Sequence, residues 1–184
     1  VMEKVNGRIP VIAGTGSNDT KSSIELTKKA ESLGVDGIMV VAPYYNRPSQ
    51  AGLYEHFKVI AEATSLPVMI YNIPGRTGVN VDVDTLVELS KIDNITSVKE
   101  ASADLDAMAE IIERTGDDFY LYSGDDSLTL PVLAIGGKGT VSVSSHVVGN
   151  EMKAMIKAFT SGSLEEAASL HRKLLATFNA MFSA

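Results

Sequence analysis

The stretch ITSVKEAS, residues 95–102, places Lys99 near the end of an apolar, β-branched run. Similar runs recur along the chain: IPVIAGTG from Ile9, DGIMVVAP from Asp36, LPVMIYNIP from Leu66, FYLYSGDD from Phe119 and GTVSVSSHVV from Gly139. Between them, apolar residues recur at the i, i+3 and i+4 positions that are typical of amphipathic helices. Near-continuous apolar strands joined by single helices indicate a parallel sheet whose outer face is covered. The chain is therefore expected to be an α/β protein.

The spacing of the strand ends narrows this expectation. Pro43, Tyr71 and Lys99 all fall near strand ends, and Tyr71 lies midway between the other two in the sequence. Equal βα units in a parallel sheet predict a (β/α)8 TIM barrel, of which about six βα units are present in this chain. The alternative is an open, doubly wound sheet, which usually shows a crossover break and a phosphate-binding fingerprint after its first strand.

The chain has fewer residues than a complete barrel of this type requires. A complete barrel takes about 250 residues, whereas this chain has 184. The segment VMEKVNG at Val1 has the pattern of the last turn of a helix, and Ala184 falls within an apolar helical pattern. We expect residues 1–184 to form a single barrel domain that is truncated at both ends and lacks the first two βα units and a C-terminal helical tail. Such a remnant would have open sheet edges and an exposed apolar face.

Composition excludes several classes of function. The absence of cysteine removes disulfides, thiolate nucleophiles and cysteine-ligated metals. The net charge of −7 argues against a general affinity for nucleic acid or an anionic membrane. No membrane span or secretory signal is visible, so a cytoplasmic location is expected. The three histidines lack ligand spacing, and Asp125 and Asp126 are better explained by helix capping or loop hydrogen bonds, so no metal or cofactor is expected.

Lys99 is the first candidate for chemistry. Strict alternation would place Ile95, Ser97 and Lys99 on one face of the strand, and function in a parallel barrel collects at the carboxyl ends of its strands. An ammonium group directed into a barrel loses solvation, which lowers its pKa and makes the amine available to attack a carbonyl as a Schiff-base nucleophile. The alternative is a lysine that reaches out to solvent or pairs with a nearby acid.

The preceding strand end adds two more candidates. Tyr71 lies one βα unit before Lys99 and should face the same pocket, where a phenol can carry protons. Pro74 and Gly75 then force a turn, after which Arg76 offers a rigid fork suited to a carboxylate. Taken singly, Tyr71 could be a core tyrosine and Arg76 a solvated loop charge.

Six motifs together carry a family resemblance: GTGSNDT, APYYNRPSQAGLYEHF, YNIPGRTG, VKEAS, YSGDD and GTVSV. With these motifs the chain resembles the 4-hydroxy-tetrahydrodipicolinate synthase family over essentially its whole length. The resemblance implies a lyase of the diaminopimelate route to lysine. Such an enzyme condenses pyruvate with aspartate semialdehyde through a lysine Schiff base and needs no cofactor.

The resemblance also implies roles for individual residues. Lys99 matches the lysine that forms the imine with pyruvate, and Tyr71 matches the tyrosine that moves protons. Arg76 matches the arginine that holds a substrate carboxylate. Gly124 and Val141 match positions that line the pyruvate end of the site.

The tyrosine pair of PYYNRP implies an assembly. Tyr45 matches a tyrosine that reaches across a subunit contact to complete the proton relay of a neighbour, although an ordinary aromatic loop would also fit the pair. Tyr44 would then be an interface residue too, and Tyr44 and Asn18 match contacts for lysine in members that this amino acid inhibits. The resemblance implies a homo-oligomer, usually a tetramer built as a dimer of dimers.

The chain departs from the family pattern at two points. It has no GTTGE-like turn, so a threonine of the proton relay is not matched. Ser22 stands where regulated members have an acidic residue, which predicts weak or absent inhibition by lysine. A pyruvate-dependent sugar-acid aldolase, such as N-acetylneuraminate lyase, stays an alternative, although Arg76 and Thr77 after YNIP favour the synthase. A non-catalytic barrel fragment is a further alternative.

Overall fold

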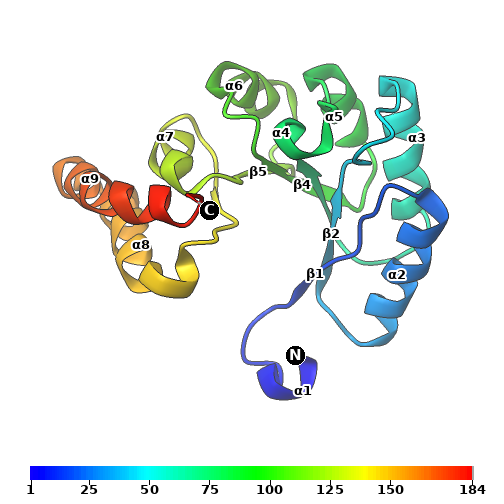
Figure 1. Ribbon diagram of the computed structural model, residues 1–184, viewed down its shortest axis with the longest axis horizontal. Helices are drawn as coiled ribbons and strands as arrows, with labels where there is room; N and C mark the ends of the chain where they lie inside the picture. Colours follow the sequence, from blue (N-terminus) through cyan, green and yellow to red (C-terminus); the bar gives the residue numbers. More distant parts are fainter. Residues whose placement is uncertain (184) are drawn as a thin grey trace.

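The computed structural model describes residues 1–183 and is built on one parallel sheet (Figure 1). The sheet has six strands whose order in space follows their order in the sequence. The strands are β1 (Ile12–Gly14), β2 (Gly37–Val41), β3 (Val68–Asn72), β4 (Ile95–Glu100), β5 (Tyr120–Ser123) and β6 (Gly139–Thr140). A doubly wound sheet would reverse its strand order at a switch point. The unbroken order therefore confirms the prediction of a partial (β/α) barrel.

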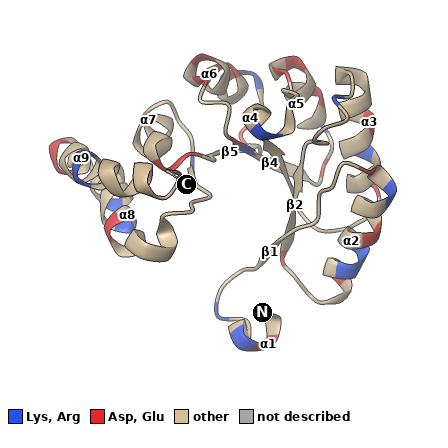
Figure 2. Cartoon of the chain, viewed as in Figure 1, with Lys and Arg blue, Asp and Glu red and all other residues tan. Residues whose placement is uncertain are grey.

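The helices lie in an arc around the outside of the sheet (Figure 1). The major helices are α2 (Thr20–Ser32), α3 (Gln50–Ala61), α5 (Val83–Leu89), α6 (Leu105–Arg114), α7 (Thr129–Ala134), α8 (Ser145–Thr160) and α9 (Leu164–Ala180). Short turns are α1 (Met2–Val5), α4 (Pro74–Thr77) and the 3-10 helix η1 (Asp126–Leu128). Figure 2 shows charges of both signs on helices such as α2 and α9. The outer surface is thus a mixed, solvated one.

Side-chain hydrogen bonds cap the amino ends of three helices, α2, α3 and α6. Asp19 accepts the backbone N–H of Ser22 at 2.8 Å at the start of α2, and Asp104 accepts that of Ala107 at 3.0 Å at the start of α6. Ser49 caps α3 in the same way through Gly52. Each cap satisfies a backbone donor that the helix itself leaves unpaired. The caps therefore define the point at which the chain turns back along the sheet.

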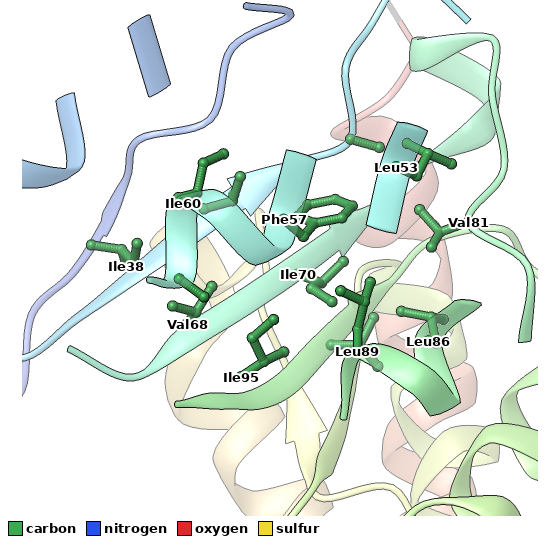
Figure 3. Close-up of a cluster of buried hydrophobic side chains, with 14 of the residues drawn as sticks. Ile38, Leu53, Phe57, Ile60, Val68, Ile70, Val81, Leu86, Leu89 and Ile95 are labelled. Carbon is green, nitrogen blue, oxygen red and sulfur yellow. The ribbon is translucent and has the colours of Figure 1, made fainter. Parts of the chain in front are cut away.

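The core lies between the sheet and this layer of helices (Figure 3). Ile38, Val68 and Ile70 project from the strands onto α3 and α5, where Phe57 and Leu89 are fully buried. Burying each such side chain contributes about 1.5–3 kcal/mol. This packing holds β2, β3 and β4 together and so fixes the strand ends that follow.

Strand β4 departs from the predicted alternation at one residue. Its pairing with β3 shifts register, so that Val68 lies opposite Ile95 and Met69 lies opposite Ser97. Ile95 is consequently buried in the outer core and not on the inner face with Ser97, as strict alternation predicted. A one-residue irregularity turns the preceding side chains to the other face. The prediction was wrong for Ile95, whereas Ser97 borders the hollow on the inner face of the sheet.

The inner face of the sheet carries that open hollow, which has a volume of about 410 Å³. It is bordered by Ile12, Met69, Ser97, Tyr122 and other side chains of β1 to β6. Within residues 1–183, β1 and β6 each pair with one neighbour only. Within this part of the chain, the inner face of the sheet is therefore open and each outer strand has one unpaired edge.

Candidate active site

Lys99 and Tyr71 are neighbours at the carboxyl ends of β4 and β3. They are direct register partners in the parallel ladder, and Lys99 Nζ lies 4.0 Å from the centroid of the Tyr71 ring. A cation at this distance is attracted by the ring face. The equal spacing of the strand ends in the sequence thus brings the two predicted residues into contact.

The pKa of the Lys99 amine is lowered by its surroundings. Its residue surface is only 8% exposed, and burial lowers its pKa below the ordinary value of 10.5. The negative charges of Asp125 and Asp126 oppose this shift, and Arg76 adds to it. A neutral amine is the nucleophilic form. The lowered pKa therefore increases the share of the nucleophilic form at a given pH.

The same surroundings act on the phenol of Tyr71, where only the effect of burial on the pKa is reversed. Burial raises the pKa of its phenol, Asp125 raises it further, and Arg76 partly offsets both effects. The hydroxyl consequently stays protonated at neutral pH, where it can both donate and accept a proton. Tyr71, Lys99, Arg76 and Asp125 thus form one electrostatic group at the barrel mouth.

Gly124 leaves room for the lysine side chain. A Cβ at this position would lie 2.5 Å from the Cβ of Ala101 and 3.2 Å from Cε of Lys99. The Gly124 N–H donates to the Glu100 carbonyl at 2.7 Å, which holds the backbone tightly against β4. Because any side chain would collide here, only glycine allows this approach.

Val141 lies just beyond β6, at the far side of the same sheet. Its N–H donates to the Ser123 carbonyl at 2.9 Å, and the residue borders the hollow on the inner face. It therefore contributes an apolar wall next to the β5 end that carries Gly124.

A second hollow, of about 520 Å³, lies between the loop after β2 and the segment that contains α4. Arg76 borders it from α4, and Tyr44 and Tyr45 border it from the loop after β2. The Tyr45 N–H donates to the Thr77 carbonyl at 3.1 Å, which ties the two loops together. The structure thus brings Arg76 and the tyrosine pair into one cavity.

Tyr45 is unusual in both exposure and backbone. The residue is 88% exposed and its φ angle is +72°. A large side chain in this left-handed region is uncommon and strained. Asn18, the remaining predicted residue, donates to the Asn46 side chain at 3.3 Å and so lies beside the same loop.

Two functional candidates were missed by sequence reasoning. Asn72 and Glu100 are each only 1% exposed and lie in register with one another, one residue beyond Tyr71 and Lys99. Their separation in the sequence equals that of the neighbouring pair. Asn72 and Glu100 could therefore have been identified from the sequence as polar residues at corresponding positions of two apolar strands.

The described part of the chain contains neither a cluster of metal-binding side chains nor a helix that could span a membrane. Over residues 1–183 no group of three or more His, Cys, Asp or Glu side chains is arranged to hold a metal ion. In the same residues, every helix falls short of the length and apolar character that a membrane crossing demands.

Comparisons with known proteins all find members of one enzyme family. The model of the dihydrodipicolinate synthetase family matches residues 1–184. The 4-hydroxy-tetrahydrodipicolinate synthase 1 of Halalkalibacterium halodurans is 62% identical over 182 residues, which are 99% of this chain and 62% of that protein.

Solved structures agree in fold. A crystal structure of dihydrodipicolinate synthase from Bacillus anthracis has a TM-score of 0.98 and 58% identity, and the match covers all of this chain and 63% of that one. The chloride-inhibited synthase of Acinetobacter baumannii, complexed with pyruvate, has a TM-score of 0.95 and 39% identity, with coverage of 100% and 63%. The chain spans about 62% of the length of the curated relative named above. On this similarity over its whole extent, the chain belongs to the dihydrodipicolinate synthetase family.

Proposed function

We propose that the protein is a 4-hydroxy-tetrahydrodipicolinate synthase in which Lys99 forms the covalent intermediate. The amine attacks the ketone of pyruvate, and loss of water gives an imine. Loss of a proton from the methyl carbon then gives an enamine, whose carbon bonds to the aldehyde carbon of aspartate semialdehyde. Cyclisation by the substrate amino group releases Lys99. The single observation that carries this proposal is the buried Lys99 amine 4.0 Å from the Tyr71 ring.

The other residues around the strand ends have separate tasks in this proposal. Tyr71 transfers protons during imine formation and tautomerisation. Arg76 binds a substrate carboxylate with its planar fork. Gly124 allows the close approach of Lys99 to the end of β5 at the pyruvate end of the site, and Val141 supplies an apolar wall. The relative that is complexed with pyruvate supports this choice of first substrate.

We also propose that a second copy of the chain covers the tyrosine loop. Tyr45 is almost fully exposed in a strained backbone conformation, and burial by a partner would compensate for that strain. Tyr45 would then complete the proton relay of the neighbour, with Tyr44 in the same contact, in a dimer of dimers. Residues 1–184 act as one barrel-type domain in this assembly, which we place in the cytoplasm together with its small-molecule substrates.

Inhibition by lysine is proposed to be weak or absent. Asn18 lies at the tyrosine loop, but Ser22 donates its hydroxyl to the Asp19 carboxylate at 2.6 Å. The Asp19 carboxylate is thereby engaged in the cap of α2, and Ser22 itself brings no negative charge. An inhibition constant for lysine as low as that of strongly regulated relatives would refute this proposal.

The test of the activity uses two substrate pairs in parallel. Pyruvate with aspartate semialdehyde is compared with pyruvate and N-acetylmannosamine, and products are identified by mass spectrometry. The proposal expects a cyclic dicarboxylate from the first pair only. A nine-carbon sugar acid from the second pair would instead assign the sugar-acid aldolase reaction.

A further inference from the structure

A hydrogen-bond network centred on Asn72 and Glu100 lies next to Lys99 and Tyr71, on the opposite face of the sheet. Asn72 Nδ2 donates to Glu100 Oε2 at 2.9 Å and to Asn80 Oδ1 at 2.8 Å. The Val81 N–H donates to Asn72 Oδ1 at 3.0 Å, and the Ser102 N–H donates to Glu100 Oε1 at 2.8 Å. Both carboxylate oxygens of Glu100 and every polar atom of the Asn72 amide are thus engaged.

The network joins the elements that carry the candidate active site. Asn72 and Glu100 are register partners, as are Tyr71 and Lys99 one residue earlier. Because side chains alternate along a strand, the network is on the outer face and the site on the inner face. Asn72 also holds Val81, which closes the loop that contains Arg76. Strand ends and loop are therefore fixed by the same two side chains.

A carboxylate in this position calls for an explanation. Glu100 is 1% exposed, and burial raises the pKa of its carboxyl group, an effect that its hydrogen bonds from Asn72 and Ser102 oppose. A buried charge is costly unless its hydrogen bonds are complete. Only a carboxylate offers two acceptor oxygens to two donors here, since a glutamine amide would present its own N–H groups to one of them.

We propose that Glu100 is a positioning residue, which acts through Asn72 to hold Lys99 against Tyr71 and to set the Arg76 loop. This inference rests on the proposed function for its catalytic consequence, but the geometry that it assigns can be tested without pyruvate. Glu100 does not touch the reacting atoms. It acts by fixing the two strand ends at the distance that the chemistry requires.

The first measurement is the rate of the Lys99–pyruvate adduct, trapped by borohydride, in the Glu100→Gln variant. A strand-end displacement of the order of 1 Å lowers such a rate by about 10- to 100-fold, and the expected loss is in this range. Asn94→Ala is the matched control. Asn94 donates to the Ala61, Thr64 and Leu66 carbonyls next to the amino end of the same strand, so it perturbs β4 far from the site. The control is expected to react within about twofold of the unchanged chain.

The second measurement is the pH dependence with which acetic anhydride labels Lys99 in the absence of pyruvate. Glu100→Gln is expected to move the labelling midpoint upward by about one pH unit, because a loosened strand end admits water to the amine. Asn94→Ala is expected to leave it in place. If Glu100→Gln does not fold, Asn80→Ala on the exposed part of the loop replaces it, with an expected threefold or greater loss of adduct rate.

The outcomes separate the two proposals. The positioning role of Glu100 is overturned if Glu100→Gln, or the Asn80→Ala variant that replaces it, gives the same adduct rate and the same labelling midpoint as Asn94→Ala. If the unchanged chain forms no adduct while the variant still shifts the Lys99 midpoint, the positioning inference stands and the proposed function fails.

Discussion

The amine of Lys99 lies over the ring of Tyr71, 4.0 Å from its centroid, at the carboxyl ends of two adjacent strands. The contact has two consequences for chemistry. It places a phenol next to the amine proposed as the nucleophile, and it helps to bury that amine, whose residue is 8% exposed. Both follow from the register of β3 against β4, which the outer-face core enforces.

Tyr71→Phe separates these two effects. The variant retains the ring over the amine but loses the hydroxyl, so the fold should be unchanged. Removal of a general acid–base group lowers rates by about 10²- to 10⁴-fold, and the rate of pyruvate adduct formation on Lys99 should fall within that range. This rate is measured by stopping incubations with borohydride at different times and quantifying the modified Lys99 peptide by peptide mapping. A variant as fast as the unchanged chain would remove Tyr71 from the proton relay.

Gly124→Ala tests the close approach at β5. Its Cβ would lie 2.5 Å from Ala101 Cβ and 3.1 Å from the Glu100 carbonyl oxygen. Overpacking of this kind destabilises proteins by about 1–3 kcal/mol, and we expect loss of the pyruvate adduct as well. Gly149→Ala in α8 is the matched control, because the nearest atom to its Cβ is 3.9 Å away.

The control should retain its stability. Gly149 directly follows the kink of α8 at Val148, and the space around its Cβ is open, so Gly149→Ala should unfold within about 0.5 kcal/mol of the unchanged chain and should react normally. Urea unfolding of both variants provides the comparison. Equal stability of the two variants would contradict the crowding inferred at Gly124.

The pH dependence of adduct formation reports the charge environment of Lys99. Burial lowers the pKa of Lys99, whereas Asp125 raises it. The rate should therefore rise with pH and level off below the ordinary 10.5 of a lysine amine. Asp125→Asn removes the opposing charge, so its profile should level off at a still lower pH. Asp118→Asn, at the amino end of β5, serves as the control, and a shift of the same size there would argue against a local effect of Asp125.

Several of these features could be predicted from the sequence, and others could not. The equal intervals between strand ends aligned Tyr71 with Lys99 because parallel βα units of one length bring equivalent positions to the same edge. Ile95 was misplaced because alternation takes no account of the register shift between β3 and β4. The close approach at Gly124 depends on tertiary contacts with β4, which leave no mark on the local pattern.

The loops were the least predictable part. The left-handed φ of Tyr45 contradicts what its residue type favours, so sequence alone would not suggest it. The Asn72–Glu100 pair was hidden for a different reason. Each residue follows a more conspicuous neighbour, and the equal separation of the two pairs in the sequence does not by itself show that these side chains meet.

His56 should make the stability of the chain depend on pH. It is 5% exposed, its Nδ1 contacts the Thr20 hydroxyl at 2.8 Å, and burial lowers its pKa from 6.5 to about 4. The unfolded chain therefore binds the proton first as the pH falls. Stability is complete above pH 6.5 and is lost between there and about pH 4, by on the order of 3 kcal/mol.

The measurement is the free energy of unfolding in urea at several pH values across this window. His56→Gln should flatten the dependence, whereas His146→Gln, which removes an exposed histidine in α8, should keep the slope of the unchanged chain. An unaltered slope in His56→Gln would show that the buried imidazole is not its source.

Mass spectrometry after borohydride reduction shows whether Lys99 becomes an imine of pyruvate. Incubation with pyruvate should add one reduced pyruvate unit to the peptide that contains Lys99, and Lys99→Arg should abolish the adduct without unfolding the chain. A folded protein whose Lys99 stays unmodified, or an adduct that persists in Lys99→Arg, would show that Lys99 is not the residue that forms the imine.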